Sequence, residues 1–141
     1  MSIAWTDDLS RVDWEEASEL YRVAPLGTKS AEHLRVVFTN SMFRCFAFEE
    51  GKLVAAGRCL SDGRDCAYLA DVAVLPSHQG KGLGGHIIRT LMDRVKDHRK
   101  IILYAVPGKE PIYARFGFRR MTTAMAVFSD EGQTRIYTTD V

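Results

Sequence analysis

Hydrophobic and polar positions follow two different periods along the chain, and each period predicts one type of element. Apolar residues recur every three or four positions, as in amphipathic helices, at residues 13–24, 30–41 and 82–99. Shorter apolar runs typical of strands occur at residues 3–5, 43–48, 53–60, 67–74 and 101–106. Near the C-terminus the pattern predicts a short helix at 110–116, followed by one or two strands at 118–120 and 124–128.

The order of these elements predicts an α/β fold with a mixed, mostly antiparallel sheet. The runs at 43–48 and 53–60 are joined by a turn that contains Gly51, which predicts an antiparallel hairpin. The run at 67–74 is nearly all apolar, as in a central strand that is buried on both faces. A long helix separates it from the strand at 101–106, which predicts one β-α-β crossover. We therefore expect helices on both faces of the sheet.

Composition and charge narrow the class of protein. Hydrophobic residues make up 46% and charged residues 26% of the 141 residues, and no linker or repeat divides the chain, so we expect a single domain over residues 1–141. The formal net charge of +1 offers no broad attraction for nucleic acid or an anionic membrane. There is no apolar run of bilayer length and no signal-peptide pattern. We expect a cytoplasmic protein with neither nucleic acid nor membrane as a partner.

The three cysteines, Cys45, Cys59 and Cys66, form no metal-binding pattern. There is no CxxC pair and no histidine at ligand spacing, so no metal site is expected. Cys59 and Cys66 would face each other if Asp62 and Gly63 formed a two-residue hairpin turn. In a reducing cytosol we expect free thiols that pack as small hydrophobic residues.

A glycine-rich segment lies between the buried strand and the long helix, with glycines at 80, 82, 84 and 85. Glycines leave backbone N–H groups unshielded, the helix start adds unpaired donors and a positive dipole end, and Lys81 adds a full charge. The helix also has no Ser, Thr, Asp or Asn at its start, so a bound anion would supply the missing cap. The segment predicts a site for a phosphate or pyrophosphate. The alternative is a tight turn that merely caps the helix.

Neither of two common phosphate-binding motifs fits this segment and its context. Gly80-x-Gly82-x-x-Gly85 matches the dinucleotide fingerprint. Its context differs, because five residues separate Val74 from the first glycine and the earlier strands form hairpins instead of a parallel series. A Walker A loop is excluded because no Gly-Lys-Ser/Thr sequence occurs.

Read as Gln79-x-x-Gly82-x-Gly84, after a strand that ends at Val74, the segment resembles the acetyl-CoA signature of the GNAT superfamily of N-acetyltransferases. The order of elements is similar to that of the family, and residues 113–118 resemble its Tyr-x-x-x-Gly-Phe segment, so the resemblance extends over about residues 12–128. It implies a GNAT-like fold and an acyltransferase that moves an acetyl group from acetyl-CoA to a primary amine, by direct attack in a ternary complex.

The resemblance also implies where acetyl-CoA binds. Its pantetheine amides would pair with the backbone of the last three strand residues, Val72, Ala73 and Val74. Its pyrophosphate would lie on the loop amides of Gln79, Gly80, Lys81, Gly82, Leu83, Gly84 and Gly85. Tyr113 matches the family's general acid, and an ordinary tyrosine pKa of about 10 keeps it protonated at neutral pH. The alternative for Tyr113 is simple packing beside Ile112 and Phe116. No metal is implied.

A general base is not evident in the sequence. The strand positions at which relatives often carry one hold Tyr68 and Ala70, and neither is a good base. Asp71 is the only carboxylate in the strand, and alternation places it on the face opposite Ala70 and Val72. This favours a hydrogen-bonded structural role for Asp71, and a water chain would then deprotonate the amine.

The acceptor is the least defined part of the prediction. Residues 1–29 contain six acidic and three basic side chains, whereas residues 76–100 contain six Lys or Arg and two Asp. In this family the first two helices border the acceptor cleft, so an acidic border would suit a cationic amine, either a small molecule or a protein lysine. Solvated helix faces explain the charges equally well. The alternative functions are a non-catalytic acyl-CoA sensor of the same fold and a nucleotide-binding regulator. A homodimer is also open, in which residues 118–141 supply an edge strand.

Overall fold

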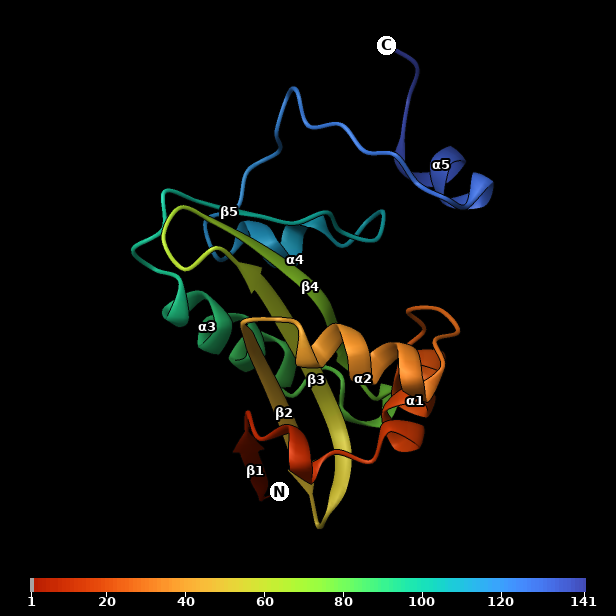
Figure 1. Ribbon diagram of the computed structural model, residues 1–141, viewed down its shortest axis with the longest axis vertical. Helices are drawn as coiled ribbons and strands as arrows, with labels where there is room; N and C mark the ends of the chain where they lie inside the picture. The colour runs from red at the N-terminus through yellow and green to blue at the C-terminus, as the bar shows by residue number, and fades with distance from the viewer. Residues whose placement is uncertain (1) are drawn as a thin grey trace. The chain divides into compact units, whose positions relative to one another are not determined.

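The computed structural model describes residues 2–141 and groups them into two compact units (Figure 1). The first unit, Met1–Leu103, contains the five strands and the three longest helices of the described chain. The second unit, Tyr104–Val141, contains α4 (Glu110–Ala114) and α5 (Glu131–Tyr137). One domain over residues 1–141 stays a prediction.

The first unit is built on a single mixed sheet whose strands follow one another in sequence order. The strands are β1 (Ile3–Thr6), β2 (Phe43–Glu49), β3 (Lys52–Ser61), β4 (Cys66–Val74) and β5 (Lys100–Ile102). The pairs β1–β2, β2–β3 and β3–β4 are antiparallel, and the pair β4–β5 is parallel. The predicted α/β class, the hairpin and the crossover are confirmed. The parallel series of a dinucleotide-binding fold is not present in this sheet.

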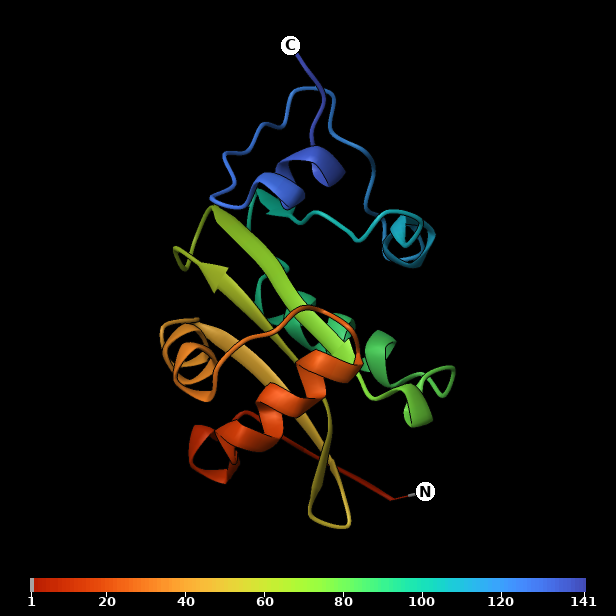
Figure 2. The ribbon, with the colours of Figure 1, turned by 90° about the vertical axis from the view of Figure 1, so that its right-hand side faces the viewer.

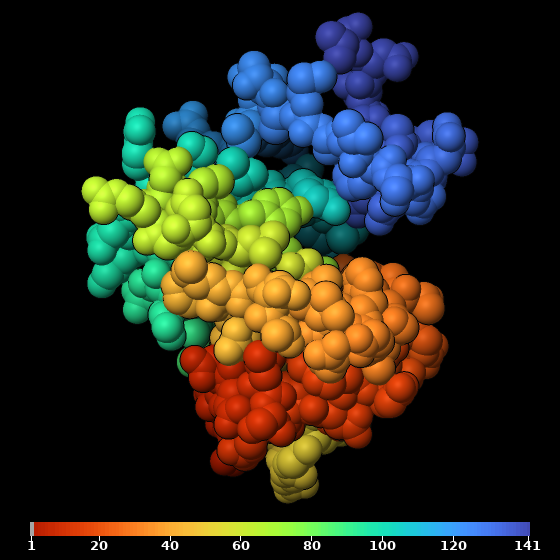
Figure 3. All heavy atoms as spheres, in the orientation of Figure 1, coloured from red at the N-terminus to blue at the C-terminus, as the bar shows by residue number. Residues whose placement is uncertain are grey.

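Helices cover both faces of the sheet (Figure 2). α1 (Trp14–Val23) and α2 (Ala31–Thr39) lie on one face, and α3 (Leu83–Arg94) lies on the other. Asp13 caps the start of α1, and its carboxylate accepts a hydrogen bond from the N–H of Glu15 at 2.9 Å. The space-filling view shows α1 and α2 as a continuous layer, with the β2–β3 turn projecting beyond it (Figure 3). The two faces of the sheet therefore have different surroundings.

The core has one layer on each face. On the α1/α2 face, Phe38 and Phe46 are fully buried, with ring centroids 5.3 Å apart. On the α3 face, a Cβ added at Gly57 would lie 2.6 Å from the side chain of Ile87, so the glycine allows α3 to approach the sheet closely. Burial of one such large apolar side chain contributes about 1.5–3 kcal/mol. The sheet is held between these two apolar layers.

The connection from α3 to β5 differs from the prediction. α3 ends at Arg94 instead of continuing to residue 99, and β5 has three residues instead of six. The end of β3 and the β3–β4 loop hold this connection: His98 Nε2 lies 2.6 Å from Ser61 Oγ, the last residue of β3, and the N–H of Lys100, the first residue of β5, donates to the Asp65 carbonyl at 3.1 Å. Tertiary contacts thus override the local helical pattern.

The length of the β3–β4 loop determines whether Cys59 and Cys66 can face each other. The loop spans residues 62–65, and Asp62 accepts hydrogen bonds from three successive backbone N–H groups, which lowers the pKa of its carboxyl to about 2. Asp62 and Gly63 therefore do not form the two-residue turn that would bring Cys59 and Cys66 face to face. Cys59 lies opposite Leu69 and not opposite Cys66, and all three cysteines are free thiols, as expected.

In the second unit the predicted strands at 118–120 and 124–128 are wrong, since no ladder among residues 2–141 includes them. A strand exists only where a partner strand completes its hydrogen bonds, and composition does not reveal that partner. Phe128 instead packs in an aromatic cluster with Tyr104 and Tyr137, at centroid distances of 5.7 Å to each. The helix α5 was not predicted, although Asp130 caps it by accepting from the N–H of Gly132. None of the helices in the described chain is long and apolar enough to cross a membrane.

Candidate functional site

One edge of β4 is open along most of its length. β4 pairs with β3 up to Val74, but it pairs with β5 only at Cys66, Ala67 and Tyr68. From residue 69 to residue 74, no strand of the described chain lies on the β5 side of β4. Backbone N–H and C=O groups that point to this side can bind an extended ligand that carries amides.

A bulge in β4 lies at the centre of this open edge. Ala56 of β3 lies opposite Ala73, and Arg58 lies opposite Ala70, so two residue steps on β3 match three on β4. Asp71 lies in the bulge with φ of 55°, a left-handed conformation that few residues other than glycine adopt. The extra residue bends β4 just beyond its last pair with β5.

The bulge corrects one prediction about the faces of β4. Ala70 lies opposite Arg58, and Asp71 binds the Arg58 side chain, so both residues lie on the α1/α2 face. The prediction that Asp71 and Ala70 lie on opposite faces is wrong, because a bulge interrupts the alternation on which it relied. Val72 lies on the α3 face, where its side chain is close to Gly57, so it is on the face opposite Asp71 as predicted.

The loop after β4 is fastened to the sheet at two points. The Gln79 side-chain amide donates to the carbonyl of Val74 at 3.1 Å. His78 Nε2 lies 2.9 Å from Glu49 Oε1 at the end of β2, and this contact holds the pKa of the Glu49 carboxyl below its usual value. The loop is therefore ordered by the chain's own side chains.

The loop and the first turn of α3 expose a row of backbone donors. The six N–H groups of residues 80–85 donate to no backbone carbonyl of residues 2–141, and Gly82 at the helix start has no side-chain cap. Gly80 and Gly82 have φ of 78° and 84°, and beyond the adjacent residues no atom of the described chain lies within 4 Å of a Cβ added at either. Lys81 is exposed in the same loop. These donors, the open space and the cation fit a phosphate or pyrophosphate group.

Asp71 is held by its neighbours. Its Oδ2 accepts a hydrogen bond from Arg58 Nε at 2.7 Å, and both side chains are less than one-fifth exposed. Its backbone carbonyl accepts from the hydroxyl of Tyr21 at 2.5 Å. Burial, and secondarily the charge of Asp71, raise the pKa of Tyr21 well above its usual value, so its hydroxyl stays protonated. The predicted hydrogen-bonded state of Asp71 is confirmed.

Tyr113 lies in α4 of the second unit, whereas the residues predicted to bind acetyl-CoA lie in the first. Its ring forms an edge-to-face contact with Phe118, with centroids 6.1 Å apart. Burial raises the pKa of Tyr113 above its usual value. The phenol is therefore a proton donor throughout the neutral range.

Comparison with known proteins identifies the family. The sequence pattern of the acetyltransferase (GNAT) family matches residues 6–118, most of the chain. The chain belongs to the GNAT family of acetyltransferases. No curated protein matches the sequence significantly. GNAT enzymes transfer acyl groups, and no group of three or more metal-ligating side chains occurs in the described part of this one.

Solved structures share the fold of this GNAT protein at low sequence identity. A protein of unknown function from meticillin-resistant Staphylococcus aureus is 24% identical with a TM-score of 0.81, and the match covers 90% of this chain and 99% of that chain. Glucosamine-6-phosphate N-acetyltransferase from Arabidopsis thaliana is 18% identical with a TM-score of 0.68, covering 92% and 100%. A predicted acetyltransferase from Clostridium acetobutylicum, solved with acetyl-CoA, is 16% identical with a TM-score of 0.70, covering 90% and 95%.

Sequence reasoning missed two residues near the open edge of this GNAT sheet. Tyr21 lies within the helical pattern of residues 13–24, and Arg58 lies in a strand run that is otherwise mostly apolar. Both carried a signal, because a buried tyrosine hydroxyl or guanidinium needs a hydrogen-bond partner. The sequence did not show that the partner of both is Asp71.

Half of the acidic side chains near the N-terminus have local structural partners. Asp8 and Asp13 cap helical turns, and Glu19 forms an ion pair with Arg22 on α1. These contacts account for three of the six acidic residues without any ligand. The acidic side chains of residues 1–29 are therefore weaker support for a cationic acceptor amine.

Proposed function

We propose that this GNAT enzyme transfers the acetyl group of acetyl-CoA to a primary amine, by direct attack of the amine in a ternary complex. One observation carries the proposal: the unpaired backbone groups on the edge of β4 are followed along the chain by the unpaired N–H groups of the loop and of the first turn of α3. The free edge of β4 runs to Val74, and the six unpaired amides begin at residue 80, after a loop tied back to Val74 by Gln79. An extended diamide arm that ends in a pyrophosphate matches this arrangement.

In this proposal the two parts of the site bind different parts of acetyl-CoA. The backbone of Val72, Ala73 and Val74 pairs with the pantetheine amides in the manner of an added strand. The amides of residues 79–85, the positive end of the α3 dipole and Lys81 bind the pyrophosphate. Because the loop is already fastened to the sheet, little ordering cost accompanies binding.

The chemistry requires one proton donor and one proton acceptor. When the amine attacks the thioester carbon and the C–S bond breaks, the nitrogen loses a proton and the departing sulfur gains one. Tyr113 is proposed to protonate the sulfur, supported by its place in the segment matched to the family and by a pKa that burial raises. Asp71 is engaged by Arg58, so water is proposed to accept the proton of the amine.

The test is release of free thiol from acetyl-CoA in the presence of a panel of amines, which includes a polyamine, an arylalkylamine, an aminoglycoside, an amino acid and a lysine peptide. Calorimetry with CoA, ATP and NAD is measured on the same protein. We expect thiol release that depends on the amine, and we expect the protein to bind CoA but neither ATP nor NAD. Binding of CoA with no thiol release from any amine would favour a non-catalytic sensor. Preferential binding of ATP or NAD would contradict the proposed function.

A further inference from the structure

The direction of the backbone groups on the open edge of β4 depends on its bulge. In an antiparallel strand, the N–H and C=O of successive residues point alternately to one neighbour and to the other. Loss of the bulge would shift residues 72–74 by one position against β3. Each backbone N–H and C=O group of residues 72–74 that now points to the open edge would then point to β3, and each group that now points to β3 would point to the open edge. The bulge therefore decides which amides an added ligand meets.

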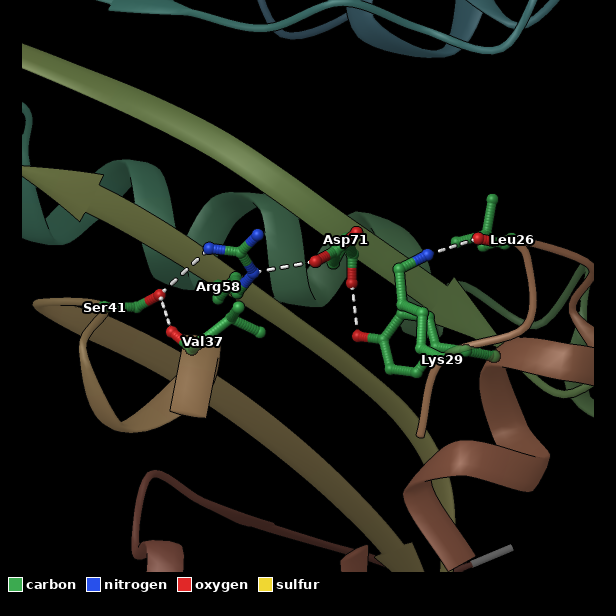
Figure 4. A network of polar contacts seen from close by, with 7 residues as sticks. Leu26, Lys29, Val37, Ser41, Arg58 and Asp71 are labelled. Atoms are coloured by element: carbon green, nitrogen blue, oxygen red, sulfur yellow. Dashed lines mark hydrogen bonds and ion pairs between the residues drawn. The ribbon is translucent and has the colours of Figure 1, made fainter. Parts of the chain in front are cut away.

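Asp71, which forms the bulge, is held at two separate atoms (Figure 4). Arg58 Nε of β3 binds its carboxylate at 2.7 Å, and the Tyr21 hydroxyl of α1 donates to its carbonyl at 2.5 Å. Left-handed backbone at a residue other than glycine persists only where surrounding contacts impose it. These are two such contacts, and neither comes from β4 itself.

Arg58 is itself fixed by the chain beyond α2. Its Nη1 donates to Ser41 Oγ at 3.2 Å, and the buried Ser41 hydroxyl donates to the carbonyl of Val37 at 2.7 Å. Arg44 is the cross-strand neighbour of Arg58 and also contacts Ser41, through the backbone carbonyl at 3.1 Å. Within residues 2–141, the hydrogen bonds of Arg44 go to the backbone carbonyls of Ser41 and Asp7, and none goes to Asp71. Arg44 is therefore a matched control for Arg58.

We propose that Arg58 and Tyr21 are positioning residues for acetyl transfer. By holding Asp71 at its side chain and at its carbonyl, they keep the β4 bulge in the one register that directs the backbone of residues 72–74 to the open edge. The inference rests on the proposed function for the identity of the ligand. The effect on the strand is independent of any ligand.

The test uses Arg58→Met, Arg58→Lys, Tyr21→Phe and the control Arg44→Met. Affinity for CoA is measured by calorimetry, and amide exchange of residues 69–74 is measured on the protein without ligand. We expect Arg58→Met to weaken CoA binding by about tenfold, the usual size of coupling between residues in contact, and to speed exchange in β4. Arg58→Lys, which keeps a cation for Asp71, should recover part of both effects. Tyr21→Phe should speed exchange in the same residues, and Arg44→Met should change neither readout.

A second background separates positioning from other roles of Arg58. Glycine adopts a positive φ without support, so Asp71→Gly should keep the bulge without the ion pair. In that background Arg58→Met should cause no further loss of CoA affinity. Equal losses in both backgrounds would overturn the proposal, as would unchanged exchange and affinity in Arg58→Met. If the unsubstituted protein failed to bind CoA, the proposed function would fall, while the exchange of β4 in Arg58→Met and Arg44→Met would still decide whether Arg58 holds the bulge.

Discussion

Trp5 of β1 and His86 of α3 stack face to face, with ring centroids 3.7 Å apart and planes 12° apart. His86 follows directly after the six unpaired amides, and its N–H donates to the carbonyl of Gly82 at 3.0 Å. The stack joins the edge strand of the sheet to the first turn of α3. It fixes the start of the helix in place before any ligand arrives, and such preorganisation favours tight binding.

Substitution of the loop glycine tests the predicted pyrophosphate site. Gly82→Val should weaken CoA binding by about 2 kcal/mol, or about 30-fold, because a side chain at φ of 84° displaces backbone donors from a charged ligand. Gly51→Val is the control, since Gly51 has φ of 78° and equally open space, in the β2–β3 turn. Both variants should lose similar stability by thermal melting, and only Gly82→Val should lose affinity. Equal CoA affinity in the two folded variants would contradict the site.

Removal of one hydroxyl tests the proposed general acid. Tyr113→Phe keeps the ring that packs against Phe118, so CoA binding should persist while turnover falls by about 10²-fold. Tyr137→Phe, in the aromatic cluster of the same unit, should turn over normally. The rates are compared where chemistry limits turnover. Normal turnover of Tyr113→Phe under those conditions would assign Tyr113 to packing.

The ion pair of Asp71 predicts a larger effect on stability than on catalytic pH dependence. Asp71→Asn leaves the guanidinium of Arg58, mostly buried, without its anionic partner, and should lower the free energy of unfolding by about 2 kcal/mol. The pH profile of kcat/KM should keep its rising limb, because water and not Asp71 is the proposed acceptor of the amine proton. Loss of that limb with an unchanged melting temperature would instead identify Asp71 as the base.

The buried thiols predict a loss of stability at alkaline pH. Burial raises the pKa of Cys45 and of Cys59 to about 11, from an ordinary value near 9. Between these two values the unfolded chain releases thiol protons that the folded chain retains, so stability falls as pH rises from 9 to 11. Chemical denaturation at several pH values measures this slope, and Cys45→Ala should reduce it. At neutral pH, alkylation should reach the partly exposed Cys66 first.

The sequence predicted the elements whose partners are close along the chain. The β2–β3 hairpin, α1 and the start of α3 follow from local spacing, from the Asp13 cap and from the glycine at the start of α3. The bulge at Asp71 could not be predicted, because it depends on the register between β3 and β4 and on donors from α1 and β3. The strands predicted after Gly117 are wrong for a similar reason. An apolar run becomes part of a sheet only where a partner strand lies beside it, and the sequence does not show that partner.

The contacts between residues 61–65 and residues 98–100 join β4 and β5 at one end only, so the open edge of β4 has one closed end and one free end. β4 and β5 are fastened together where both begin, and they separate after Tyr68. Six residue steps separate Tyr68 from Val74, and because an extended step is about 3.3 Å and the bulge shortens the strand, the span is at most about 20 Å. In the proposed site the diphosphate of a donor lies beyond Val74, so the length of the open edge sets the distance from the diphosphate to the last β4–β5 pair. We therefore expect the enzyme to select donors by the length of the chain between phosphate and thioester. In donors with a shorter chain, the reacting carbon should not reach the point near Tyr68 where β4 and β5 separate.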